Sequence, residues 1–74
     1  MLWFFVRAPG ERRTCETRLA VAGEGYELVV TDDTGVHAEA FRDLSSLLAR
    51  EHELLGAWRA MGWRPEPPAA TPRR

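Results

Sequence analysis

The chain has 74 residues, a formal net charge of −1 and one cysteine. A chain of this length forms at most one domain, and it buries only about 60% of the surface that its unfolded form exposes, so its hydrophobic core is marginal. The near-neutral charge excludes a strongly basic protein that attracts nucleic acid over its whole surface, and the single cysteine excludes a disulfide framework and a cysteine-based zinc site.

The single cysteine, Cys15, favours a cytoplasmic location, and the residue usage favours a bacterial origin. All ten positively charged side chains are arginine, and lysine, asparagine, glutamine and isoleucine are absent. Lysine, asparagine and isoleucine are encoded by AT-rich codons, so their absence indicates a GC-rich genome. We expect no signal peptide, because the first apolar run is too short and Arg7 follows it at once. No stretch approaches the length of a membrane span.

Four segments have the residue types or the alternation of β-strands, and a turn signal separates each from the next. The segments are residues 2–7, 11–22, 26–31 and 36–41, and the turns contain Pro9-Gly10, Gly23-Glu24-Gly25 and Asp32-Asp33-Thr34-Gly35. Because the turns are short, consecutive strands must pair as antiparallel hairpins. The sequence therefore predicts a four-stranded antiparallel meander.

The pattern changes to a helical period after Asp43, a good N-cap because its carboxylate can accept hydrogen bonds from the amides of the first turn. Apolar side chains then recur at helical spacing. They are Leu44, Leu47, Leu48, Leu54, Leu55, Trp58 and Met61. Gly62 fits the left-handed position that ends a helix, and in that arrangement Trp63 would fold back on Trp58. The sequence therefore predicts one helix over residues 44–61.

Together these elements predict an α+β fold, a four-stranded antiparallel meander followed by one C-terminal helix (ββββα). We expect a single domain over residues 1–64. The tail, residues 65–74, is rich in proline and lacks an apolar face, so we expect it to be disordered or extended.

The first strand carries large apolar side chains on both faces, because successive side chains of a strand alternate. The two sets are Trp3 and Phe5 on one face, and Leu2, Phe4 and Val6 on the other. One helix covers one face of a sheet, so one set is left for another molecule. We expect this strand to lie at or beside the interface of a homodimer, or of a complex with another protein. Alternatively, it sits at an inter-subunit edge and extends the sheet.

Glu51 lies near the centre of the arc that the apolar side chains of the helix span, so its carboxylate should face the sheet. Burial of an unpaired carboxylate is costly. We therefore expect a partner for it, and the candidates are Arg18, Arg42 and His37. A buried ion pair is one interpretation, and contact with a ligand or a general acid–base role is the other.

Neither a metal site nor a cofactor site is expected. His37 and Glu39 share a face of the fourth strand, but His52 points about 100° away from Glu51 around the helix, so these side chains do not converge as metal ligands must. The chain also lacks a nucleophile–base pair and a glycine-rich phosphate loop. We therefore expect no enzymatic activity.

Single-stranded nucleic-acid binding is an alternative function. Arginine beside aromatic side chains on an open sheet face is a layout that binds unpaired bases and phosphates. The residues that would make these contacts are Trp3, Phe5, Arg7, Arg12, Arg13 and Arg18. Four glutamates between residues 11 and 27 balance much of their positive charge.

The element order over residues 2–62 resembles that of Whirly proteins and PUR repeats, in topology only. These families pair ββββα units into dimers or pseudo-dimers and bind single-stranded nucleic acid, so the resemblance implies both properties here. No functional residue is carried over from it, because fold alone does not assign function. The sequence thus favours a small protein that acts by association, with itself or with another protein, and nucleic-acid binding is the alternative.

Overall fold

The computed structural model describes residues 1–20 and 23–66. It consists of an antiparallel sheet and one helix in the predicted order, ββββα, followed by a short fifth strand. The elements are β1 (Leu2–Val6), β2 (Arg12–Leu19), β3 (Tyr26–Asp32), β4 (Gly35–Phe41), α1 (Leu44–Ala60) and β5 (Arg64–Pro65). The predicted α+β fold class is therefore confirmed.

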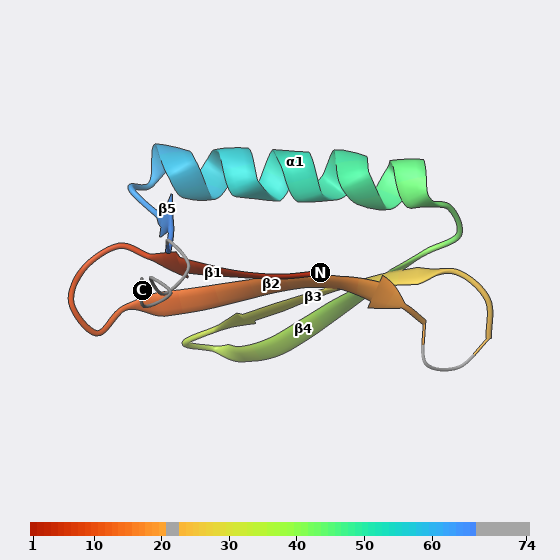
Figure 1. Cartoon of the computed structure of the whole chain (residues 1–74), viewed down its shortest axis with the longest axis horizontal. Coiled ribbons are helices and arrows are strands. Elements are labelled where there is room, and N and C mark those ends of the chain that lie inside the picture. Colours follow the sequence, from red (N-terminus) through yellow and green to blue (C-terminus); the bar gives the residue numbers. More distant parts are fainter. Residues whose placement is uncertain (21–22, 67–74) are drawn as a thin grey trace, which may run out of the picture.

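The sheet is a meander, and α1 lies across one of its faces (Figure 1). The strand order is β4-β3-β2-β1-β5, with antiparallel pairing throughout. Strands β1 to β4 each pair with the next strand along the chain because the connections between them are short. β4 therefore lies at one edge of the sheet.

After α1 the chain returns to the sheet, which the sequence did not predict. β5 pairs with the last two residues of β1, Phe5 and Val6, and the Glu66 N–H donates a 2.8 Å hydrogen bond to the Phe4 carbonyl. This half of β1 is therefore not a free edge, which corrects the suggestion that β1 extends the sheet into a second subunit. The predicted domain ended at residue 64, so β5 (Arg64–Pro65) crosses that boundary. Residues 67–74 of the predicted tail lie outside the described residues.

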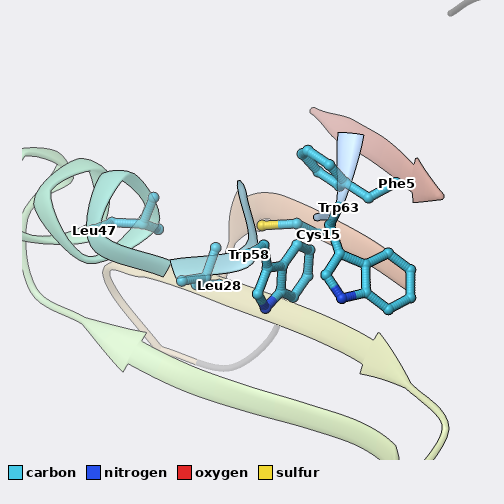
Figure 2. Packing of buried hydrophobic residues seen from close by; sticks show 6 residues of the cluster. All are labelled: Phe5, Cys15, Leu28, Leu47, Trp58 and Trp63. Carbon is cyan, nitrogen blue, oxygen red and sulfur yellow. The ribbon is translucent and has the colours of Figure 1, made fainter. Parts of the chain in front are cut away.

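The pairing register decides which side chains of the sheet meet the helix. Trp3 lies opposite Cys15, and Cys15 lies opposite Val30. The odd-numbered residues of β1 and β2 and the even-numbered residues of β3 therefore share the helix-facing side. Figure 2 shows the core, in which no residue is more than 5% exposed: Phe5, Cys15, Leu28, Leu47, Trp58 and Trp63.

Local signals place both ends of α1. Asp43 Oδ1 accepts a 2.8 Å hydrogen bond from the Ser46 N–H at the first turn. At the other end Gly62 has a φ of 97°, and the Trp63 N–H donates to the Trp58 carbonyl at 3.0 Å. The two indole rings are tilted against each other with their centroids 6.5 Å apart. The predicted N-cap and the predicted glycine stop are both confirmed.

The sheet-facing stripe of α1 is narrower than the sequence predicts. Leu47 and Trp58 are buried, whereas Leu44 and Leu48 are each 47% exposed and Met61 is 50% exposed. α1 packs mainly on β3 and β4, so a small sheet covers one stripe of the helix and leaves the apolar residues on its flank in solvent.

Candidate association surface

One side of the sheet has no described element packed on it. α1 covers the opposite side (Figure 1), and β5 extends the sheet in its own plane. We call the uncovered side the open face. It consists of the even-numbered residues of β1, β2 and β4 and the odd-numbered residues of β3.

Cross-strand pairing arranges the open face in rows. The central row runs across four strands and is uncharged: Phe4, Thr14, Thr31 and Val36. On β2, Arg12 lies on one side of this row and Glu16 on the other. On β1, Val6 pairs with Arg12 and Leu2 pairs with Glu16. The open face therefore has an uncharged central row, with Arg12 on one side of it and Glu16, Arg18 and Glu27 on the other.

Large apolar side chains of the open face remain in solvent. Phe4 is 39% exposed, Leu2 49% and Val36 69%. Val29 is 7% exposed because it lies in an inner strand, between Glu16 and Ala38 of its neighbours. These exposed apolar side chains make the open face a candidate for association, although Trp3, Leu19 and the flank of α1 are exposed on the other side.

Both arginines of the open face have a carboxylate partner. Arg18 Nε lies 3.0 Å from Glu27 Oε1 on the neighbouring strand. An Arg12 terminal nitrogen lies 2.8 Å from a carboxylate oxygen of Glu66, and the Arg12 guanidinium lies 5.2 Å from the centroid of the Phe4 ring. Positive charge on this face is therefore neutralised within the chain, which suits an apolar partner better than a polyanion.

The structure divides the predicted interface residues of β1 between two environments. Leu2, Phe4 and Val6 belong to the open face, as one of the two expected sets. Phe5 is 5% exposed and packs edge-to-face on Trp58, with ring centroids 5.2 Å apart. Trp3 shares the helix-facing side and is 44% exposed. The core thus takes Phe5, and the even-numbered residues of β1 are the ones that lie on the open face.

The residues predicted to contact nucleic acid do not form one surface. Arg12 and Arg18 lie on the open face, whereas Trp3, Phe5 and Arg13 belong to the helix-facing side. Phe5 is too deeply buried for its ring to stack on a base. The predicted set is therefore divided between the two sides of the sheet, and on the open face Arg12 lies against Phe4, a ring that the prediction did not include.

Two of these arginines instead cover the tryptophans of the core. The Arg13 guanidinium lies 4.4 Å from the centroid of Trp63 and 5.3 Å from that of Trp58. Arg7 lies 4.9 Å from Trp63 and forms an ion pair with Glu11 at 2.9 Å. Sequence reasoning missed this packing role, although the alternation of β2 already placed Arg13 on the same side as the core cysteine.

Glu51 faces the sheet, as predicted, but its neighbour is a thiol. Cys15 is fully buried, and its Sγ lies 3.9 Å from Glu51 Oε2. Burial, reinforced by the charge of Glu51 and by this contact, raises the pKa of Cys15 from its usual 9.0 to about 11. The thiol is therefore protonated in the folded protein at neutral pH, and it is a poor nucleophile.

The three expected partners of Glu51 lie elsewhere, which corrects the predicted ion pair. Arg18 is on the open face with Glu27, and Arg42 is exposed. His37 Nε2 lies 2.8 Å from the Thr34 hydroxyl in the β3–β4 turn. Within residues 1–20 and 23–66, no group of three or more histidine, cysteine, aspartate or glutamate side chains could hold a metal ion.

Sequence reasoning also overlooked β4 as an exposed surface. Every residue of this strand except Phe41 is exposed. The signal was available, because a meander always leaves its last strand with one unpaired side unless another element covers it.

Comparison with protein-family models, with curated proteins and with solved structures finds no match to this chain. Within residues 1–20 and 23–66, α1 is not long and apolar enough to cross a membrane.

Proposed function

We propose that this chain is a non-enzymatic association protein, which forms a homodimer by packing its open face on the open face of a second copy. The observation that carries the proposal is the central row of that face, where Phe4 and Val36 are exposed and no residue is charged. Aromatic side chains dominate the energetics of interfaces because each can bury about 150–250 Å².

The pattern of the open face supports a second copy as the partner. A two-fold axis along the central row reverses the strand direction and keeps each strand facing its own counterpart. Phe4 then meets the partner's Phe4, and Leu2 meets the partner's Val6. Two sheets packed in this way lie about 10 Å apart, with their apolar side chains between them.

The charges on β2 fit the same axis. Arg12 and Glu16 lie on opposite sides of the central row, so the rotation brings Arg12 to the partner's Glu16 and Glu16 to the partner's Arg12. Arg12 already binds Glu66, and Glu16 lies 3.7 Å from Arg18, so this axis adds opposite charges to existing ion pairs and places no like charges of β2 together, as an isologous interface requires.

Substitution of exposed leucines provides a matched test. Leu2→Glu places a charge on the open face, whereas Leu19→Glu places the same charge on the helix-facing side of β2, where Leu19 is 72% exposed. We expect Leu2→Glu to weaken face-to-face association at least about ten-fold, because the carboxylate would be buried against an apolar side chain. Leu19→Glu should leave association unchanged, as sedimentation velocity can measure.

Phe4→Glu extends this test to the centre of the face. We expect it to raise the dissociation constant at least about thirty-fold, the effect of losing an aromatic hot spot. Circular dichroism would establish that each variant is folded. Folded variants at residues 2 and 4 that associate as the unmodified chain does would contradict the proposal.

A further inference from the structure

β4 is a long and regular edge strand. It has seven residues, it pairs with β3 residue for residue from Gly35 to Phe41, and it contains neither lysine nor proline. Within the described residues, no strand pairs with its outer side. Alternate N–H and C=O groups therefore point outward along a regular edge, which can template pairing with another strand.

We infer that β4 pairs with β4 of a second copy, antiparallel across a two-fold axis at Ala38, and so joins two sheets into one. This contact is separate from the face-to-face contact of the proposed function, because it uses the backbone of an edge and not the open face.

The length and the side chains of β4 favour one register. A two-fold axis perpendicular to the sheet keeps residues of one face opposite residues of the same face, so the axis passes midway between one residue and its own copy in the partner. An axis at Glu39 places two carboxylates opposite each other, which is unfavourable for like charges. Axes at Val36, His37 and Ala40 lie off the centre of the strand Gly35–Phe41 and leave part of it unpaired. An axis at Ala38 instead places His37 of each chain opposite Glu39 of the other chain.

The side chains on the open face also fit this register. Val36 lies opposite the partner's Ala40, and Ala38 lies opposite the partner's Ala38. These residues are small and uncharged, so they bring no repulsion to the pairing. On the helix-facing side, Glu39 already binds Arg50 Nε at 3.2 Å, and a carboxylate has further lone pairs to accept from a second donor.

The edge contact and the face contact are both two-fold symmetric and lie on different surfaces. A chain that makes both belongs to an assembly of at least four copies. Loss of either contact alone leaves a dimer, and loss of both leaves a monomer. The two proposals therefore fail in distinguishable ways.

Substitutions at residue 37 test the edge contact. His37→Glu opposes two carboxylates across the axis, and we expect it to raise the dissociation constant of the edge contact at least about ten-fold. His37→Gln introduces a side chain of the same size as glutamate but without its charge, so it should keep the contact. Adding Glu39→His to His37→Glu exchanges the two residues, restores complementarity across the axis and should restore the assembly.

Sedimentation velocity of the unmodified chain, of Phe4→Glu, of His37→Glu and of their combination separates the outcomes. We expect an assembly of at least four copies, two kinds of dimer and a monomer, in that order. A dimer that His37→Glu leaves intact and Phe4→Glu dissociates would overturn the edge contact and keep the face contact. A dimer with the opposite response would overturn the face contact instead.

Amide hydrogen exchange gives a readout that needs no variant. Pairing at the edge protects the outward amides of β4, so their exchange should slow as the protein concentration rises, while the amides bonded to β3 change little. If the protein associates but its outward amides exchange equally fast at every concentration, pairing of β4 with a second copy is wrong. The edge would then remain for a strand of another protein.

Discussion

Cys15 is the residue whose chemistry the fold alters most. Its side chain is enclosed between the sheet and α1, where a thiolate would lose its hydration and meet the negative charge of Glu51. Both effects favour the protonated form. One interpretation of the sequence placed Glu51 in an ion pair with an arginine or a histidine. In the structure its neighbour is the Cys15 thiol instead.

Glu51→Gln should lower the pKa of Cys15 from about 11, because it removes the charge of Glu51, one cause of the increase. The pKa should stay above 9.0, since burial is the largest cause and remains. Titration of the ultraviolet absorbance of the thiolate measures this value directly. A pKa that does not move would show that Glu51 has no electrostatic influence on the thiol.

The same shift predicts a pH dependence of stability. The unfolded chain ionises the thiol near pH 9.0, whereas the folded chain holds the proton to about pH 11. The contribution of Cys15 to the free energy of unfolding is therefore complete below pH 9 and is lost as the pH rises toward 11. Urea unfolding over this range should show a smaller decline for Cys15→Ala than for the unmodified chain, and equal declines would contradict the shift.

At the scale of single elements, local patterns sufficed for β1 to β4 and for α1. Alternation, turn residues and the cap at Asp43 act within a few positions, so they can be read without knowledge of the fold. β5 has no such signal. It is only two residues long and contains Pro65, and it is a strand because it pairs with the end of β1. The exposed flank of α1, which includes Leu48, was likewise not predictable, since it depends on the width of the sheet beneath the helix.

The end of α1 makes a stability prediction at Gly62, whose φ of 97° disfavours side chains with a Cβ. A Cβ there would contact the Arg7 side chain at an ordinary 3.6 Å, so any cost arises from the backbone. We expect Gly62→Val to lower the free energy of unfolding by about 1 kcal/mol or more, as measured by urea denaturation.

Gly56 provides the matched control inside α1. A Cβ at this position would meet nothing within 4 Å, so Gly56→Ala should raise the free energy of unfolding by about 0.5–1 kcal/mol. A Gly62→Val protein as stable as the unmodified chain would contradict the role assigned to the glycine stop.

The second prediction at this scale concerns β5. A chain that ends after Glu66 keeps the hydrogen bond to Phe4 and the ion pair with Arg12, and we expect it to unfold as the full chain does. A chain that ends after Trp63 loses both contacts and should be less stable by about 1–2 kcal/mol. Equal stability of the two truncated chains, measured by thermal denaturation, would show that β5 contributes nothing.

For the molecule as a whole, the sequence showed that β1 has two apolar faces, but it did not show which one the helix covers. That choice depends on register, because Phe5 shares its side with Cys15 and meets Trp58 in the core. Such a choice involves residues far apart in the chain, so no local pattern encodes it. Once it is made, the even-numbered residues of β1 lie on the open face.

The central claim is that this chain acts by association with itself. Static light scattering of the unmodified protein at tens of micromolar tests it most directly, because the molar mass reports the number of copies without assuming which surface they share. We predict a mass of at least two chains, which falls on dilution. A single-chain mass across that range would contradict the account.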